Sequence, residues 1–207
     1  MAATARHPNR RLEILEKAAP IFAQHGYEGT AIRSIAMACD ITEAAIYRHF
    51  EHKADLYGEV IRFKARQHDL RGDLFESVGG RTIEEILTAV AHHILALADR
   101  DPELVRLMFS SSLEADHATA TLFQEIRAPY IEFLSGQITD RIVTGELRDV
   151  EPYITSRCFV GMVMDCALHS GVWSRLTGVA FEAETVVCNN VPIFARGLLK
   201  KTPGEVA

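Results

Sequence analysis

The pattern of apolar and polar positions along this chain is helical from near Arg10 almost to the C-terminus. Apolar residues recur every three or four positions, which is the period of a helix with one buried face. The pattern predicts two short helices within residues 30–53, and longer ones over 10–25, 53–74, 82–98, 102–113, 117–143, 152–173 and 182–199. Pro129 predicts a kink in the 117–143 helix. No segment shows the alternation that is typical of a strand, so the sequence predicts an all-α fold.

The two short helices within residues 30–53 are separated by three residues. The apolar face of the first has the spacing i, i+3, i+4 and i+7 and consists of Ile32, Ile35, Ala36 and Cys39. Thr30 precedes this face and is a candidate N-cap. In the connection, Asp40 tolerates a left-handed backbone, and Thr42 can cap the second helix. A connection this short makes the two helices cross steeply.

The second short helix has an inner and an outer face. Ile46 and Phe50 share the inner face. The outer face consists of Glu43, Ala44, Tyr47 and Arg48. A short helix of this kind, held at a steep angle by a supporting helix, is the element that enters the major groove in helix-turn-helix proteins. The segment therefore predicts DNA binding.

Residues 10–57 resemble the N-terminal DNA-binding region of the TetR-like transcriptional regulators. The resemblance lies in a helix that ends in a glycine, followed by the ordered pattern Thr30, Ile35-Ala36, Ile41-Thr42, Ile46-Tyr47, Phe50 and Lys53-x-x-Leu56. The remaining three quarters of the chain resemble the family only in helical pattern and length. The resemblance implies a homodimeric repressor that binds an inverted-repeat operator in double-stranded DNA and leaves it when a small-molecule effector occupies a pocket.

The resemblance and the geometry together give candidate DNA contacts. Donors to phosphate oxygens would come from Thr30, Tyr47, His49 and Lys53. Base edges would be contacted from the first turn of the second helix, which consists of Thr42, Glu43, Ala44 and Ala45. Glu43 can instead stabilise the helix dipole without any DNA. Arg33 and Arg48 can reach the DNA or belong to an ordinary solvated surface.

The chain departs from the family pattern at three places. Asp40 stands where the turn usually has glycine, and the second helix begins with residues 42–45, Thr-Glu-Ala-Ala, rather than Ser-x-Gly-Thr. Ala45 therefore lacks a hydroxyl, and the operator of another family member does not carry over. His52 replaces a small polar residue before Lys53, so the sequence predicts a poorly capped start of the fourth helix.

The sequence predicts a short arm and two domains. Residues 1–9 are small and polar and fit a flexible arm, and residues 10–57 form the helix-turn-helix domain, with its fourth helix continuing to about residue 74. A break of small residues over 77–80 separates this part from a helical ligand-binding and dimerisation domain at 75–207. The last two helices are apolar enough to pack against another subunit, which fits the homodimer that the resemblance implies.

The formal net charge of −6 is unusual for a DNA-binding protein, but the charge is unevenly distributed. Residues 1–66 contain 10 Lys and Arg against 8 Asp and Glu, whereas residues 67–207 contain 12 against 20. The basic surplus therefore lies with the helix-turn-helix segment, where DNA phosphates would be contacted. The surplus is small, and ordinary solvated helix faces explain it equally well.

Cysteine usage and hydropathy point to the cytoplasm. The four cysteines lie in apolar helical segments without CxxC spacing, and the sequence predicts that all are reduced core residues: Cys39, Cys158, Cys166 and Cys188. Neither a signal peptide nor an apolar run of membrane-spanning length is recognisable. We therefore expect a cytoplasmic protein that makes no contact with a membrane.

An effector-controlled switch would need a cavity in the acidic C-terminal part. Polar interruptions of its apolar faces occur at His92, His93, Arg127, Asp165 and His169. The surrounding large apolar residues include Met108, Phe109, Phe123, Tyr130, Met162 and Trp173. Apolar walls with a few directing polar groups are typical of ligand pockets, although the same residues would also build an ordinary core. The chemical identity of the effector is not readable from them.

Three other functions remain open at the level of sequence. An activator or dual regulator would make the same DNA contacts. A small helical enzyme or metal-binding protein could use Asp165 and His169, which lie one helical turn apart and so could ligate a metal or form an acid/base pair. The chain contains no nucleophile elbow, phosphate loop or HExxH motif, so we expect no enzyme and no cofactor. A helical adaptor could bind another protein through the acidic part.

Overall fold

The structure is a computed structural model that describes residues 10–68, 81–113, 120, 123–170, 178–179 and 181–200, with backbone alone for 109–113. Its elements are α1 (Arg10–Gly29), α2 (Ile32–Ala38), α3 (Glu43–Ile46), α4 (Lys53–Arg66), α6 (Ile83–Arg100), α7 (Pro102–Leu113), the π-helical turn η1 (Phe123–Arg127), α9 (Ala128–Val143), α10 (Pro152–Leu168) and α12 (Ala183–Leu198). Within these residues the only β pairing is an isolated bridge between Leu147 and Leu199. The predicted all-α fold is confirmed.

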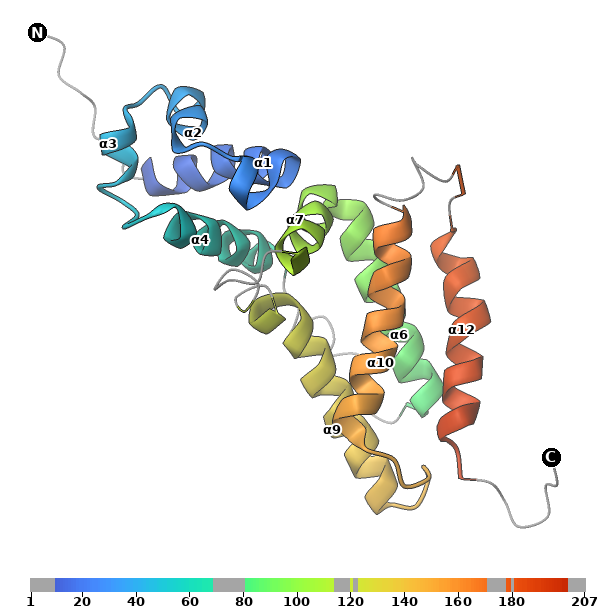
Figure 1. Ribbon diagram of the computed structural model, residues 1–207. Coiled ribbons are helices and arrows are strands. Elements are labelled where there is room, and N and C mark those ends of the chain that lie inside the picture. The colour runs from blue at the N-terminus through green and yellow to red at the C-terminus, as the bar shows by residue number, and fades with distance from the viewer. Residues whose placement is uncertain are drawn as a thin grey trace, which may run out of the picture.

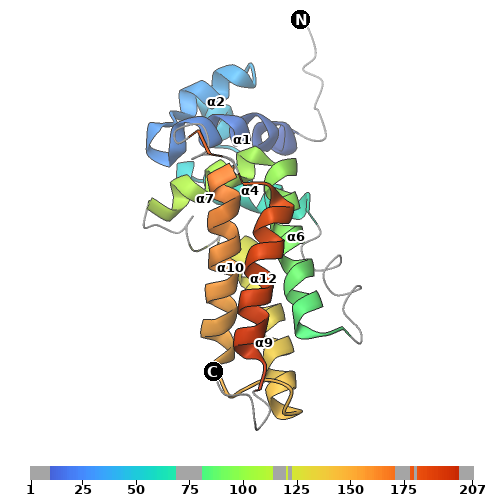
Figure 2. The same cartoon turned by 90° about the vertical axis from the view of Figure 1, so that its right-hand side faces the viewer.

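The helices form a small group at one end of the molecule and an elongated bundle at the other (Figure 1). The small group consists of α1, α2 and α3, and α4 leads from it toward the bundle. Figure 2 shows α10 and α12 side by side along the bundle, with α6 and α9 beside them. Helix α7 lies where the two groups meet and packs against α1.

Three helix boundaries differ in detail from the sequence pattern. Gly26 has φ 69°, a left-handed value that breaks the regular helix there as predicted, but helical backbone resumes and α1 ends at Gly29. The expected extension of α4 to about residue 74 is wrong, because its helix ends at Arg66 with Gln67 as C-cap. The predicted kink at Pro129 takes the form of η1, which directly precedes it. Residues 77–80 lie outside the described residues.

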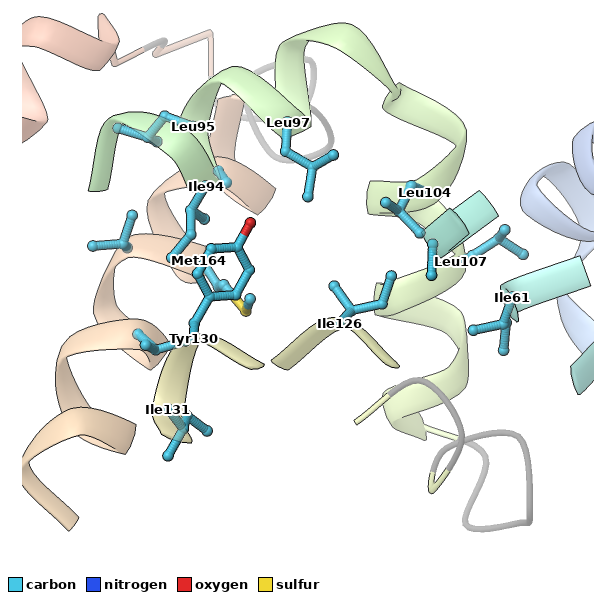
Figure 3. Close-up of a cluster of buried hydrophobic side chains, with 14 of the residues drawn as sticks. Ile61, Ile94, Leu95, Leu97, Leu104, Leu107, Ile126, Tyr130, Ile131 and Met164 are labelled. Carbon is cyan, nitrogen blue, oxygen red and sulfur yellow. The ribbon is translucent and has the colours of Figure 1, made fainter. Parts of the chain in front are cut away.

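One hydrophobic core continues from the small helical group into the bundle. Figure 3 shows Ile61 of α4 reaching toward Leu107 of α7 and Ile126 of η1. All three side chains are fully buried. Farther along the same core, Tyr130 of α9 and Met164 of α10 are also buried. Apolar burial therefore ties α4 to the bundle, at about 25 cal/mol for each Å² removed from water.

A buried charge cluster lies at the end of α4. Lys64 Nζ lies 2.9 Å from Asp101 Oδ1 and 2.9 Å from Glu103 Oε2, and His68 Nε2 lies 3.1 Å from Asp101 Oδ2. Asp101 also accepts a hydrogen bond from the N–H of Leu104 in the first turn of α7. Only 8% of Lys64 and 6% of Asp101 is exposed. The cluster thus joins the end of α4 to the α6–α7 junction.

Burial and pairing act in opposite directions on the pKa values of this cluster. Burial raises the pKa of Asp101, but the hydrogen bonds from Lys64, His68 and Leu104 outweigh it and leave the pKa below its usual value. Burial lowers the pKa of Lys64, and pairing with Asp101 and Glu103 outweighs it and raises the pKa. Both groups are therefore charged near neutral pH.

We expect Lys64→Ala to lower the free energy of unfolding by about 3 kcal/mol, because removing one partner leaves a buried charge without full compensation. The measurement is urea denaturation followed by circular dichroism. Lys17→Ala is the matched control, because Lys17 is exposed and a surface substitution changes stability by less than about 0.5 kcal/mol. Equal stability of the two variants would contradict a stabilising role for the cluster.

The same cluster sets a pH window. The depressed pKa of Asp101 makes its contribution complete above about pH 4 and lost as the pH falls further. The raised pKa of Lys64 makes its contribution complete below about pH 10 and lost as the pH rises. The stability difference between wild type and Lys64→Ala should therefore be constant between these limits and shrink outside them.

Candidate DNA-binding and effector-binding sites

The turn between α2 and α3 has the geometry that the sequence predicts. Asp40 has φ 52°, a left-handed value that is uncommon for any residue other than glycine. The N–H groups of Asp40 and Ile41 donate to the carbonyls of Met37 and Ala36, at 3.2 and 3.0 Å. The chain reverses within three residues, and α2 therefore holds α3 at a fixed angle. The predicted inner face of α2 is confirmed, since Ile32, Ile35, Ala36 and Cys39 are buried.

Helix α3 presents its polar side outward. Thr42 accepts a hydrogen bond from the N–H of Ala45 at 3.2 Å, so the predicted cap is confirmed. Ile46 and Phe50 are buried, which confirms the inner face. The exposed residues are Thr42, Glu43, Ala44, Tyr47, Arg48 and His49, and Ala45 is partly buried. The surface around α3 is therefore accessible to a large ligand.

Arg11 contacts the buried side of residues 42–50, which we call the recognition segment. Its guanidinium lies 4.9 Å from the centroid of the Phe50 ring and its Nη2 atom lies 2.9 Å from Glu59 Oε2. Glu59 is also 2.6 Å from Arg62 Nη1. Arg33 and Arg48, in contrast, have no acidic partner within ion-pair distance among the described residues. The charges of these two arginines are thus available to an external anion.

Thr30 occupies a different position from the predicted one. Its side chain is buried, and its hydroxyl donates a hydrogen bond to the carbonyl of Gly26 at 2.7 Å. The N-cap of α2 is Ala31, which makes no side-chain cap, so the predicted capping role of Thr30 is wrong. The hydroxyl instead bonds to the backbone at the point where Gly26 interrupts the regular helix. This internal partner disfavours the predicted phosphate contact of Thr30.

The start of α4 is better capped than the sequence predicts. His52 Nδ1 accepts a hydrogen bond from the N–H of Asp55 at 3.0 Å, and Asp55 accepts one from the N–H of Glu51 at 3.0 Å. The expected weak cap is wrong, because imidazole replaces the usual small polar side chain. Lys53 follows, with its Nζ atom 4.3 Å from the Tyr27 ring centroid and 3.4 Å from the Glu28 carbonyl. These contacts fix the ammonium group near the recognition segment.

Two of the predicted effector residues contact each other inside the bundle. His93 Nδ1 lies 2.8 Å from the hydroxyl of Tyr130, which is fully buried. Burial also raises the pKa of Tyr130, so its hydroxyl stays protonated. Beside this core, an apolar cavity of about 20 Å³ is lined by residues that include Met108 and Met164. A volume of this size holds about one water molecule, so a larger effector would require the helices to separate.

Two further predicted residues, Arg127 and Met162, line a groove of about 270 Å³ between α9 and α10. Arg157 of α10 also lines it, and its guanidinium lies 5.3 Å from the centroid of the Phe123 ring. Burial lowers the pKa of Arg127, and so does the positive charge of Arg157. Arg157 is not among the effector-binding residues that the sequence predicts. The available signal is that it is the only cationic residue in the mainly apolar stretch 152–168.

The remaining effector candidates lie apart from these sites or outside the described residues. His92 is near the surface, 3.6 Å from Glu184, and Asp165 is exposed. His169 stacks on Phe181 at 4.3 Å, and its Nε2 atom lies 3.0 Å from the carbonyl of Val179. Nothing is described for Trp173 or for the side chain of Phe109. The ring of His169 is thus engaged without Asp165, which disfavours the predicted metal or acid/base pair.

Other features of the described residues bear on chemistry. No cluster of three or more His, Cys, Asp and Glu side chains there is arranged to hold a metal ion. No helix among them has the length and apolar character needed to span a membrane. The expectation that all cysteines are core residues is wrong, because Cys158 and Cys188 are exposed. Both lie on the outer faces of apolar helices, where helical period alone does not distinguish core from surface.

Comparison with known proteins agrees with this geometry. Residues 14–60 match the family "Bacterial regulatory proteins, tetR family". The chain is 27% identical to the HTH-type transcriptional repressor AcnR of Corynebacterium glutamicum over 197 aligned residues. The alignment covers 92% of this chain and 95% of AcnR.

Two solved structures share the fold at lower identity. AibR in complex with isovaleryl coenzyme A and operator DNA has a TM-score of 0.66 and 23% identity, over 89% of this chain and 97% of that one. The transcriptional regulator FadR from Bacillus subtilis in complex with stearoyl-CoA has a TM-score of 0.72 and 17% identity, over 90% and 98%. The matched segment contains the capped turn and the exposed face of α3. Residues 14–60 are therefore similar to the tetR family of bacterial regulatory proteins, and the chain shares its fold with these two regulators.

Proposed function

We propose that this protein is a homodimeric transcriptional repressor that binds an inverted-repeat operator and is released from it by a small-molecule effector. The observation that carries the proposal is the exposed polar face of α3. Thr42 caps this helix, and its inner face is buried against the rest of the helix-turn-helix. The similarity to AcnR over nearly the whole chain supports repression rather than activation. A regulator of this kind acts in the cytoplasm, where a bacterial chromosome lies.

The proposed DNA contacts divide into positioning and reading. Tyr47, His49 and Lys53 hold phosphates, because their hydroxyl, imidazole and ammonium groups are donors to anionic oxygens. The first turn of α3 reads base edges, where Glu43 accepts from cytosine N4 and Ala44 contacts a thymine methyl. Arg33 and Arg48 add charge that no acidic side chain of the described residues neutralises.

The proposed dimer forms through the outer faces of α10 and α12. Large apolar side chains are exposed there: Tyr153 of α10 by 45% and Ile193 of α12 by 68%. The two helices lie side by side, so a second copy related by a two-fold axis would cover them with the same two helices (Figure 2). A two-fold dimer presents its two α3 helices to successive major grooves, about 34–36 Å apart, which accounts for the inverted repeat.

Effector control follows from the same geometry. An effector that binds the bundle better in a state with the wrong α3 separation weakens operator binding, by no more than its differential affinity for the two states. AibR binds isovaleryl coenzyme A and FadR binds stearoyl-CoA in their solved structures, which supports a small molecule as the effector of this protein.

We expect Lys53→Ala to weaken binding to every duplex, because a phosphate contact carries no sequence information. The slope of the logarithm of the affinity against the logarithm of the salt concentration should flatten by about one for each lysine lost. Fluorescence anisotropy with labelled duplexes measures both quantities. The control is Lys200→Ala, at the far end of the molecule beyond α12. An unchanged salt slope in Lys53→Ala would contradict the phosphate contact.

Glu43→Ala should alter preference rather than overall affinity. Loss of the carboxylate removes discrimination at one base pair of each half-site, worth about 1–3 kcal/mol. Competition among single-base variants of a bound duplex measures this directly. A uniform change across all variants would mean that Glu43 only stabilises the dipole of α3.

Ile193→Asp should convert the dimer to a monomer, because a carboxylate would be buried in the proposed interface without a partner. Sedimentation velocity measures the change. Val143→Asp is the matched control, since Val143 is 83% exposed on α9, which is not one of the two helices of the proposed interface. A wild-type monomer, or an Ile193→Asp dimer as stable as wild type, would contradict the placement of the interface.

A further inference from the structure

The groove between α9 and α10 contains more positive charge than its surroundings neutralise. Arg127 comes from the junction of η1 and α9, and Arg157 comes from α10. Neither has an acidic partner within ion-pair distance among the described residues, and the residues that line the groove include no acid. This lack of pairing is unusual in a part of the chain where acidic residues outnumber basic ones.

The two arginines also make an unfavourable electrostatic contribution to the stability of the folded protein. Arg127 is partly buried, and its pKa is lowered first by that burial and then by the charge of Arg157. An arginine remains charged in spite of such a shift, so the partly buried charge of Arg127 is held beside the exposed like charge of Arg157. Structural cations in a fold are usually paired with carboxylates, as Lys64 is here with Asp101. An external anion would relieve the repulsion in the groove.

The rest of the groove lining is mainly apolar. Ile131, Ile154, Val160 and Met162 contribute to it, and the Phe123 ring lies under Arg157. A guanidinium binds a carboxylate or a phosphate through two parallel hydrogen bonds, and its stacking on a ring fixes the plane of that fork. The apolar walls would meanwhile bury a hydrocarbon chain. The volume of about 270 Å³ suits part of a small organic molecule.

We propose that this groove binds the effector through its anionic group, and that the effector is an acyl compound that carries a carboxylate or a phosphate. The inference rests on the proposed function, because it names the effector class of that regulator. Arg127 and Arg157 hold the anionic group, and the apolar wall of α9 and α10 takes the chain. Binding draws Arg127, at the start of α9, and Arg157, on α10, toward the same anionic group. Because α10 is one of the two helices of the proposed dimer interface, a shift of α10 would change the dimer geometry.

Isothermal titration calorimetry of the full-length protein tests the proposal, with four probes. Octanoate offers a carboxylate, octanoyl-coenzyme A offers phosphates with the same chain, coenzyme A offers phosphates without a chain, and octanol offers the chain without charge. We expect octanoate or octanoyl-coenzyme A to bind, and the tighter of the two identifies the source of the anionic group. Octanol and coenzyme A should bind at least tenfold more weakly. Binding of octanol as tightly as the charged probes, or no binding of either charged probe, would overturn the proposal.

Substitutions locate the site. Arg127→Gln and Arg157→Gln should each weaken binding of the charged probe about tenfold to a hundredfold, as expected for the loss of a charge-assisted hydrogen bond. Arg157→Lys keeps the charge and should lose less. Arg148→Gln is the matched control, because Arg148 is exposed beyond the opposite end of α9. Wild-type affinity in both glutamine variants would overturn the proposal.

Thermal stability separates this role from a structural one. Removal of one of two like charges should leave the melting temperature of Arg127→Gln equal to or above that of wild type, whereas a structural arginine would lower it when lost. A lowered melting temperature together with unchanged probe affinity would assign Arg127 to the fold alone and overturn the proposal.

Operator binding on the same preparations distinguishes this inference from the proposed function. Probe binding that depends on both arginines without any effect on DNA affinity would support the site and contradict effector-controlled release. DNA binding by a protein that binds neither charged probe would overturn the site and leave the DNA-binding function standing.

Discussion

The buried contact between Lys64 and Asp101 determines how the two parts of this molecule sit relative to each other. Lys64 lies in the last turn of α4, the helix that leads from the recognition segment, and Asp101 caps the first turn of α7. A charge pair of this kind tolerates little displacement, because both partners lose compensation when the distance grows. The apolar contacts of Ile61 with the same region are less directional (Figure 3). The ion pair therefore fixes the relative position of the two parts, whereas the apolar core supplies most of the favourable free energy of folding.

This connection gives the bundle a mechanical route to DNA. Helix α4 is continuous from the capped residues beside α3 to Lys64, so a shift of α7 moves the recognition segment as a unit. Helix α1 also packs on α7, which adds a second contact between the two parts. An effector in the α9–α10 groove lies far from α3 along the chain, yet the groove begins at η1, which packs against α4. The proposed switch thus needs no element beyond those that already form the core.

Much of the fold follows from local sequence, whereas the sites depend on contacts between distant residues. The helical period and the Thr42 cap are properties of a few neighbouring residues, and the structure confirms them. The inward turn of Thr30 depends on the break at Gly26, and the Lys64–Asp101 pair joins residues on different helices. The spacing of apolar residues along the chain does not show which residues of different helices will meet. One usable signal was overlooked, namely a lysine on the buried stripe of α4, since a charge there requires a partner from elsewhere.

The most direct test of the account is selection of protein-bound DNA from a random duplex pool at near-physiological salt, followed by sequencing. A two-fold dimer with paired α3 helices should enrich an inverted repeat whose half-sites lie about one helical turn apart. Matches to that repeat in a genome would then indicate the regulated genes. A folded protein that enriches no motif would contradict sequence-specific DNA binding, and a single unpaired half-site would contradict the dimer.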